Sequence, residues 1–218
     1  MADAATEAWH LKDFVQPVVT IFATFVGATL AFVVAEIRSV REEKRRRRGA
    51  INTAIVTVFR MHLTLSECRK QVLAPYEHSD EGWLRAPISP VDRRDPITFD
   101  AAELAFLLNE GQGDLYTGLM LVSDKFETIV SVLQKREDLI LSSVHPVVHQ
   151  TDNLTLADRV PTREAHLLQA LYALIKEEVP VCLAGTQSLY DRLRTAWDDL
   201  ELGKVPPMHL PFNRETST

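Results

Sequence analysis

The sequence predicts an all-α protein in which a single N-terminal transmembrane helix is followed by an antiparallel bundle of four to five helices. Three observations favour this class. An uncharged apolar run lies near the N-terminus, most of the later chain repeats apolar residues every three or four positions, and no segment has a convincing strand pattern. The averages hide this division, because 46% hydrophobic residues, 25% charged residues and a net charge of −6 are ordinary for a globular chain of 218 residues.

The predicted transmembrane helix covers residues 14–37. It contains a run of 22 consecutive residues without a charge, from Phe14 to Ala35. At about 1.5 Å per residue the run would be about 33 Å long, enough for the roughly 30 Å of hydrocarbon in a bilayer. Its threonines can bond their hydroxyls back to helix carbonyls, and Pro17 falls in the first turn, where a missing N–H costs least. A buried helix of a soluble core is the competing interpretation, but such helices seldom lack charges for so long.

A basic juxtamembrane collar, residues 38–48, follows the run directly. Its seven cations are Arg38, Arg41, Lys44, Arg45, Arg46, Arg47 and Arg48. The positive-inside rule then places the C-terminal side in the cytoplasm and the short segment 1–13 outside. A cleaved signal peptide would carry its positive charges before the apolar run, so we expect a retained, single-pass anchor in the inner (plasma) membrane. A nucleic-acid patch is the alternative for the arginines, and the acidic remainder of the chain argues against it.

Net charge divides the chain in the same way. Residues 1–37 carry −3, residues 38–48 carry +5, and residues 49–218 carry −8. Anionic lipid headgroups would attract the collar and repel the acidic body. We therefore expect a bilayer with anionic headgroups as a partner, and no nucleic acid.

Small residues recur every four positions along the predicted anchor. They are Ala23, Gly27, Ala31 and Ala35. Such a stripe lets two helix backbones approach closely, which would favour association with a protein partner or with a second copy of the chain. Alanine and glycine are common in membrane helices, however, so chance also explains the pattern.

Residues 49–203 are predicted to form a cytoplasmic helical domain. Its first helix covers residues 50–73 and can continue from the anchor through Gly49, because one glycine costs only about 1 kcal/mol. Residues 75–98 hold four prolines and are expected to be irregular, at a length that indicates a functional or mobile loop. Asp100 then has the features of an N-cap.

The later helices follow from turn and capping residues. A short helix should end near Asn109, the glycines 111 and 113 should turn the chain, and Asp114 should cap a helix that extends to about Ser143. Another helix should open at Thr162 with five aliphatic residues on one side, and Pro180 should end or kink it. Those residues are Leu167, Leu168, Leu171, Leu174 and Ile175. A last helix should end before Gly203, and residues 204–218 are expected to be a flexible tail.

Catalytic signatures are missing from the sequence. It has no nucleophile elbow, P-loop or dinucleotide fingerprint, so we predict no catalytic residue and no cofactor, and an enzyme is disfavoured. The weak metal candidates are His145 and His149, but Pro146 disfavours a helix that would align them. The charged residues Asp92, Arg93, Arg94, Asp95 and Asp100 are most simply solvated. Cys68 and Cys182 are expected to be reduced core residues.

The plan resembles that of bacterial membrane proteins with one N-terminal helix, an arginine-rich collar and a helical cytoplasmic region. Residues 25–48 carry this resemblance, and residues 99–119 do so more weakly. It implies an architecture and brings no activity. We expect an interaction, scaffold or regulatory module on the cytoplasmic face of the membrane. The alternatives are a membrane-perturbing effector of the toxin or defence type, which oligomerises through its transmembrane helix, and a membrane-surface enzyme that uses residues 75–98.

Overall fold

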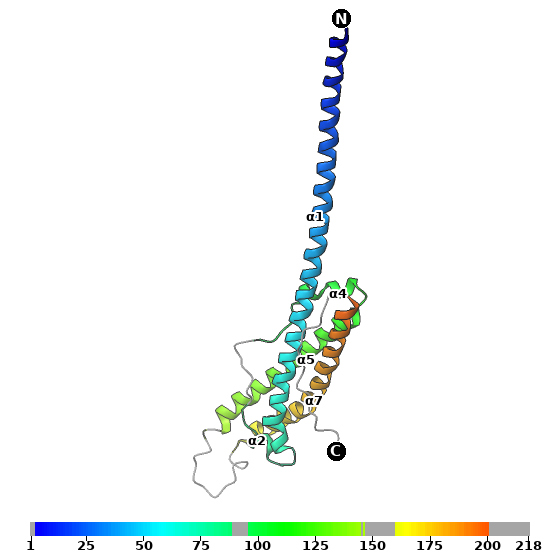
Figure 1. Ribbon diagram of the computed structural model, residues 1–218. Coiled ribbons are helices and arrows are strands. Elements are labelled where there is room, and N and C mark those ends of the chain that lie inside the picture. Colours follow the sequence, from blue (N-terminus) through cyan, green and yellow to red (C-terminus); the bar gives the residue numbers. More distant parts are fainter. Residues whose placement is uncertain (1–2, 89–95, 145, 147–159, 201–218) are drawn as a thin grey trace. The chain divides into compact units, whose positions relative to one another are not determined.

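A computed structural model describes residues 3–88, 96–144, 146 and 160–200, with side chains from residue 15 onward except at position 199. These residues are helical and contain no strand, in agreement with the predicted all-α class (Figure 1). The chain divides into two units, Met1–Arg46 and Arg47–Thr218. The boundary falls inside the basic collar, between two adjacent arginines.

Helix α1 covers Asp3–Cys68, so the backbone stays helical through Gly49, as predicted. A π-helical turn, η1 (Arg69–Leu73), and a 3-10 turn, η2 (Ala74–Tyr76), follow it. Pro75 lies in η2 and has no backbone N–H to donate. This proline accounts for the end of the regular helix.

Residues 75–88 are better ordered than the predicted loop. They include a short helix, α2 (Gly82–Arg85), and they bury Trp83, Leu84 and Ala86. The apolar content of this segment explains the difference. Its two prolines and one glycine, Pro75, Pro87 and Gly82, do not prevent a short helical turn from packing when the turn carries apolar side chains to bury. Residues 89–95 of the predicted loop lie outside the described residues.

Two short helices precede the next long one. They are α3 (Ala101–Leu104) and α4 (Phe106–Asn109). Asp100 is the N-cap of α3, as predicted: its Oδ1 accepts hydrogen bonds from the backbone N–H groups of Ala102 and Glu103 at 2.9 and 3.1 Å. After α4 the backbone of Gly111 is left-handed, with φ +73°. The N–H of Gln112 donates to the carbonyl of Leu107, which is the 6→1 bond of a Schellman turn.

Helix α5 covers Gly113–Leu139 and continues into a π-helical turn, η3 (Ile140–Val144). Its N-cap position is Gln112, without a side-chain cap bond, so the predicted cap at Asp114 was wrong by two residues. The Schellman turn determines this start, because it aligns Gln112 for the first helical turn. Asp114 lies in that turn, where a carboxylate favours the positive end of the helix dipole.

Helix α7 covers Thr162–Asp199 without a break. The prediction of a separate last helix after Pro180 was therefore wrong. An interior proline costs about 3 kcal/mol, but Pro180 is exposed while Val179 and Cys182 beside it are 0% and 1% exposed. Burial of these neighbours on one continuous face offsets the lost hydrogen bond.

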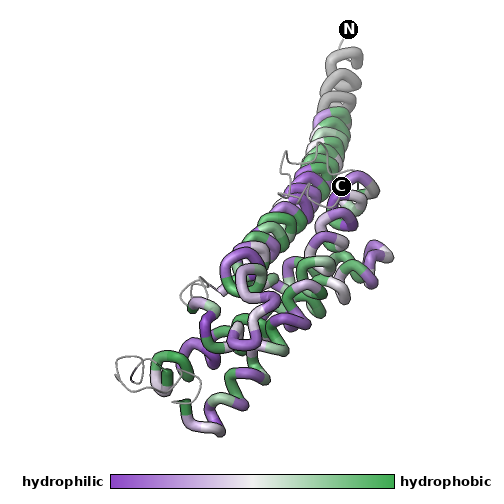
Figure 2. The backbone as a smooth tube through the Cα atoms, turned by 90° about the horizontal axis from the view of Figure 1, so that it is seen from below, coloured by the Kyte–Doolittle hydropathy of each residue, from purple (hydrophilic) through white to green (hydrophobic). Residues whose placement is uncertain are grey.

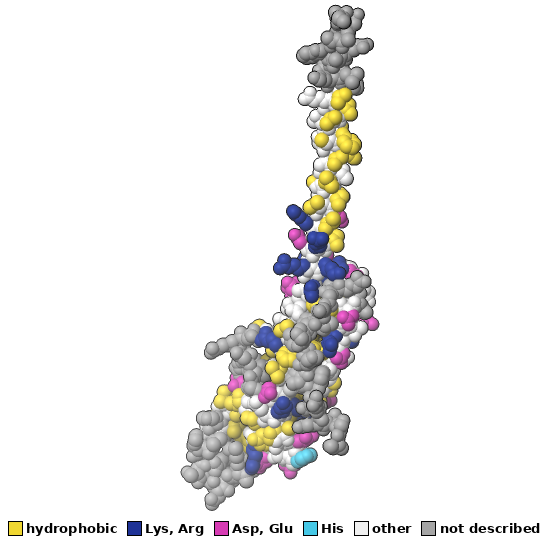
Figure 3. Space-filling model, in the orientation of Figure 1, with side chains coloured by type: hydrophobic (Ala, Val, Ile, Leu, Met, Phe, Trp, Pro, Cys, Tyr) yellow, Lys and Arg dark blue, Asp and Glu magenta, His cyan; other side chains and the backbone are white. Residues whose placement is uncertain are grey.

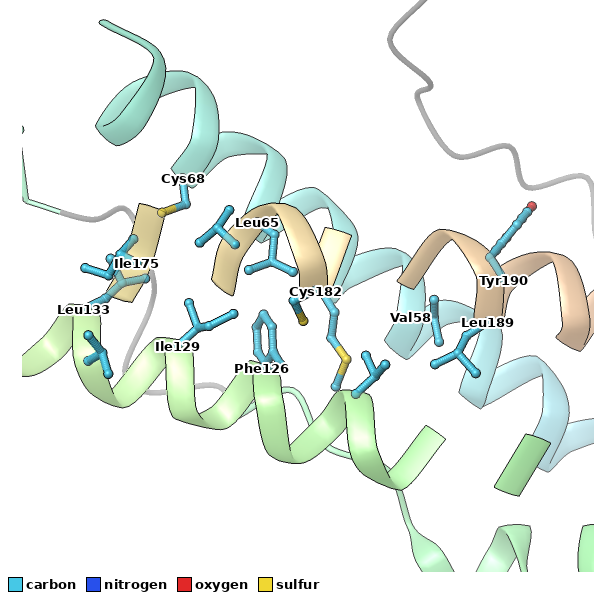
Figure 4. Close-up of a cluster of buried hydrophobic side chains, with 14 of the residues drawn as sticks. Val58, Leu65, Cys68, Phe126, Ile129, Leu133, Ile175, Cys182, Leu189 and Tyr190 are labelled. Carbon is cyan, nitrogen blue, oxygen red and sulfur yellow. The ribbon is translucent and has the colours of Figure 1, made fainter. Parts of the chain in front are cut away.

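The core of the second unit lies among α5, α7 and the part of α1 after Arg47 (Figure 4). Figure 4 shows Leu65 of α1 opposite Phe126 and Ile129 of α5, with Val58 beside Leu189 at one end of the cluster and Ile175 near Leu133 at the other. Cys68 and Cys182 are free and buried in this core, as predicted.

The direction of α7 is opposite to that of both other helices. Contacts along α7 run backward against α5, from Lys125 opposite Glu178 to Arg136 opposite Tyr172. They also run backward against α1, from Arg48 opposite Trp197 to His62 opposite Thr186. Helices α1 and α5 are therefore parallel, and residues 69–112 return the chain between them.

Candidate functional site

The anchor is the most apolar exposed surface of the first unit. All side chains from residue 15 to residue 46 are exposed, and the large apolar ones among them include Phe22, Phe25 and Phe32 at 69%, 71% and 70%. In Figure 2 the part of this helix before the collar is mostly green, with paler positions between, and in Figure 3 a band of Lys and Arg follows it. Among the described residues, one helix is long and apolar enough to cross a membrane, and this is that helix.

The threonines of the anchor have no polar hydrogen left to donate. Thr20, Thr24 and Thr29 each donate their hydroxyl to the carbonyl four residues earlier, at 2.8, 2.7 and 2.8 Å. This confirms the predicted bonding back to the helix. It also lowers the cost of placing a hydroxyl in hydrocarbon, since the group keeps a partner without water.

The small-residue stripe lies open along the same helix. Ala23, Gly27, Ala31 and Ala35 are all exposed, and a Cβ added at Gly27 would meet no atom within 4 Å. The stripe leaves room for a second helix to approach. Its predicted role in helix association stays a prediction.

The structure divides the arginine collar in two. Arg38, Arg41, Lys44, Arg45 and Arg46 belong to the first unit and are exposed. Arg47 and Arg48 belong to the second unit and contact its helical domain.

Arg47 and Arg48 contact different helices of that domain. Arg47 forms an ion pair with Glu110 and lies over the ring of Phe106, 5.7 Å from its centroid. Arg48 lies 5.6 Å from the centroid of a ring of Trp197, near the C-terminal end of α7. Cation–π contacts of this kind contribute about 0.5–1 kcal/mol at exposed sites. These two arginines therefore hold the ends of α4 and α7 against α1, besides any attraction to lipid.

Arg136 is a buried cation held by backbone oxygens. Its side chain comes from α5, is 1% exposed, and donates hydrogen bonds to the carbonyls of Trp83, Ala86 and Pro87 at 3.2, 2.6 and 3.0 Å. The carbonyls belong to the end of α2 and the residues after it, where the helix dipole is negative. The guanidinium also lies 5.7 Å from the ring centroid of Tyr172 on α7. Arg136 thus fastens the segment after η2 to the two long helices.

The electrostatics of Arg136 are dominated by burial. Desolvation lowers the pKa of Arg136, while Tyr172 and Cys68 act in the opposite direction. The guanidinium stays charged, because its ordinary pKa lies far above physiological pH. Its Nε and the hydroxyl of Tyr172 are buried without a hydrogen-bond partner among the described residues. Arg136 therefore acts as a structural clamp between α5, α7 and the segment that carries these carbonyls.

A second buried polar contact joins α1 to α7. Nδ1 of His62 lies 3.0 Å from Oγ1 of Thr186, and that hydroxyl donates to the carbonyl of Leu183 at 2.8 Å. Because the threonine hydrogen is already used, His62 must donate from Nδ1, which fixes its neutral tautomer. Desolvation lowers the pKa of His62. This hydrogen bond joins α1 to α7 inside the core, and burial favours the neutral form of His62.

The outward face of α7 carries apolar residues that the periodicity had assigned to its buried face. Leu167 and Leu174 are 46% and 39% exposed, whereas Leu168 and Ile175 are 0% and 1% exposed. Val181, seven residues after Leu174, is 51% exposed. A helix whose apolar residues point both ways is usually covered on both sides. This face is the most extended apolar surface that α7 presents outside the core.

The other sequence candidates for chemistry are not brought together in the described structure. His145 and His149 lie outside the described residues, as do Asp92, Arg93, Arg94 and Asp95. Asp100 is occupied as the N-cap of α3. Within residues 3–88, 96–144, 146 and 160–200, no group of three or more His, Cys, Asp or Glu is placed to hold a metal ion.

These features define the class as an α-helical protein with one membrane-length N-terminal helix. No protein-family model, no curated protein and no solved structure matches the chain. The features of its own residues therefore carry the functional argument.

Sequence reasoning missed Arg136 and the outward face of α7. A signal for Arg136 was available, since it follows Ile129 and Leu133 at the three- to four-residue spacing of the buried face of α5. A cation in that register is either buried or marks the edge of the face. The second signal is the seven-residue repeat of Leu167, Leu174 and Val181, which sits one position before the buried repeat of Leu168 and Ile175.

Proposed function

We propose that this protein is a single-pass membrane protein whose helical bundle acts as an interaction, scaffold or regulatory module on the cytoplasmic face of the plasma membrane. The observation that carries the proposal is the pairing of an exposed apolar helix of bilayer length with a run of exposed cations directly after it. Such a helix is stable in hydrocarbon, and the cations favour the side that faces anionic headgroups. In this proposal the second unit forms a bundle of four to five helices that lies in the cytoplasm.

The interaction role is supported by the surface of the helical domain. The outward face of α7 exposes Leu167, Leu174 and Val181, and exposed aliphatic residues aligned on one helix suit a protein partner. The buried polar groups Arg136 and His62 are used in packing contacts within the domain. Surface binding is thus better supported than catalysis.

Cysteine labelling tests the orientation of the protein in the membrane. Both native thiols are buried in the folded protein, so they should not react with the label. Cys68 and Cys182 are 0% and 1% exposed, and burial raises the pKa of the Cys182 thiol to about 11. Two single-cysteine reporters are added to the full chain: Thr6→Cys before the anchor and Ser79→Cys at an exposed position after it. Intact cells are treated with a membrane-impermeant maleimide.

We expect the Thr6→Cys protein to be labelled in intact cells and the Ser79→Cys protein to be labelled only after the membrane is permeabilised. The unaltered chain is the matched control and should stay unlabelled in both conditions. Labelling of Ser79→Cys in intact cells would overturn the proposed orientation. Release of the protein from membranes by alkaline carbonate would overturn the anchor itself.

A further inference from the structure

Helix α7 has a second apolar seam on its outward face. Leu167, Leu174 and Val181 occupy one heptad position, and Ala170 and Ala184 occupy the position three residues later. All five are exposed, while the buried face of the same helix packs against α1 and α5. The spacing of seven residues drifts by only about 20° per repeat, so the seam remains on one side of the helix.

The composition of this seam is typical of a surface that another helix covers. From Leu167 to Ala184 it spans 17 residue steps, about 25 Å at 1.5 Å per residue. Its side chains are large at one heptad position and small at the next, which lets a second helix lie close and insert its own apolar residues between them. Only one of its heptad positions between those ends carries a charge, and that residue is Glu177.

Glu177 and the backbone beside it present acceptors to whatever covers the seam. Glu177 is exposed and forms no ion pair within the described part of the chain. Lys176, its neighbour, donates instead to the backbone carbonyl of Glu77 at 3.1 Å. Pro180 has no N–H, so the carbonyl of Lys176 lacks its ordinary helical donor. The carboxylate of Glu177 and the carbonyl of Lys176 are both available to accept hydrogen bonds, which favours a cationic side chain in the partner.

The same charge argues against a second copy of the chain as the occupant. In a parallel pair of α7 helices, Glu177 would face its own copy across the seam. In an antiparallel pair that sets Leu174 against Val181, it would face Glu178. Both arrangements bring two carboxylates together, and like-charge contacts in an interface disfavour binding.

We propose that the outward face of α7 is a docking site for an amphipathic helix of another protein, with an apolar heptad seam and an Arg or Lys opposite Glu177. The inference rests on the proposed role as an interaction module and names the partner's chemistry. Leu167, Leu174 and Val181 receive the partner's apolar residues, and Glu177 selects its cation.

Photocrosslinking of the full chain in the cells that produce it tests the site. The photoreactive residue p-benzoylphenylalanine replaces Leu174, and in matched controls it replaces Leu121 of α5 or Leu63 of α1, which are also exposed leucines. We expect Leu174 to give an adduct with a different protein, mapped by mass spectrometry to an amphipathic helix. Glu177→Lys should lower the adduct yield about tenfold, and reversal of the partner's basic residue to Glu should restore it.

Each other result overturns the inference. An adduct between two differently tagged copies of the chain would assign the seam to self-association. An adduct that Glu177→Lys leaves unchanged would remove the charge selection. Adducts from Leu121 or Leu63 without one from Leu174 would place the interaction elsewhere and leave the proposed function standing. Absence of adducts at all three positions would count against both, provided that helix content by circular dichroism shows each variant folded.

Discussion

Arg136 offers the sharpest test of how this domain is held together. Arg136→Met keeps an unbranched apolar stem and removes three hydrogen bonds to the carbonyls of Trp83, Ala86 and Pro87. Hydrogen bonds to a charged group contribute about 1.5–3 kcal/mol each, but burying a guanidinium costs several kcal/mol, so the two effects partly cancel. The buried Nε without a partner lowers the net benefit further. We expect a loss of about 2–4 kcal/mol in the free energy of unfolding, since the carbonyls of the buried Trp83 and Ala86 lose the Arg136 donor.

The loss is measured by urea denaturation of the detergent-solubilised full chain, followed by tryptophan fluorescence. For a domain of this size it corresponds to a fall in Tm of about 5–15 °C. Arg85→Met is the matched control: among the described residues Arg85 pairs with Glu81 at an exposed position, so the change should alter stability by less than about 0.5 kcal/mol. Hydrogen exchange at residues 82–88 should accelerate in Arg136→Met and not in Arg85→Met. An Arg136→Met protein as stable as the unaltered chain would refute the reasoning, because it would mean that desolvation outweighs the three bonds.

Three further predictions follow from local contacts. Acidification should destabilise the domain as pH falls below about 6.5, because burial lowers the pKa of His62 and the unfolded chain then binds a proton that the folded domain does not. The urea midpoint of the unaltered chain should therefore be lower at pH 5.5 than at pH 7.5, and this difference should shrink in His62→Gln. Gly82→Ala should lower stability by about 1–3 kcal/mol, since the added Cβ would lie 2.9 Å from the carbonyl oxygen of Tyr76. A Cβ at Gly49 would meet no atom within 4 Å, so Gly49→Ala should stabilise α1 by up to about 1 kcal/mol. Thermal melts compare the two variants, and equal changes in Tm would contradict the packing argument. Asp100→Ala should lower the free energy of unfolding by about 1 kcal/mol through loss of the two N-cap hydrogen bonds, and Asp100→Asn should retain most of that stability. Urea denaturation measures both variants, and an Asp100→Ala protein as stable as the unaltered chain would show that the cap contributes nothing.

Features with a local physical cause were predictable from the sequence. The long exposed apolar helix follows from 22 residues without a charge, and the bonding of its threonines follows from their reach to the preceding turn. The cap at Asp100 and the turn at Gly111 depend on backbone geometry within a few residues. Each of these features is decided by neighbours in the chain, so a short window of sequence contains the relevant chemistry.

Features that depend on distant residues were decided by the tertiary structure. The helix α7 continues through Pro180 because burial of Val179 and Cys182 against other helices exceeds the cost of one lost hydrogen bond. The arginine collar divides between Arg46 and Arg47 because Glu110, Phe106 and Trp197 are brought to α1 only by folding.

The same distinction separates the long apolar helix from two features of the domain, the buried Arg136 and the outward face of α7. Burial of Arg136 requires the carbonyls of residues 83–87, some fifty positions away. Exposure of Leu167 and Leu174 depends on which side of α7 faces α1 and α5, and periodicity alone wrongly grouped them with the buried Leu168 and Ile175. The sequence by itself indicated where a helix of membrane length lies and where local residues cap or turn the chain. Only tertiary packing decided which charges are buried and which apolar face stays exposed, because burial is a property of contacts between segments far apart in the chain.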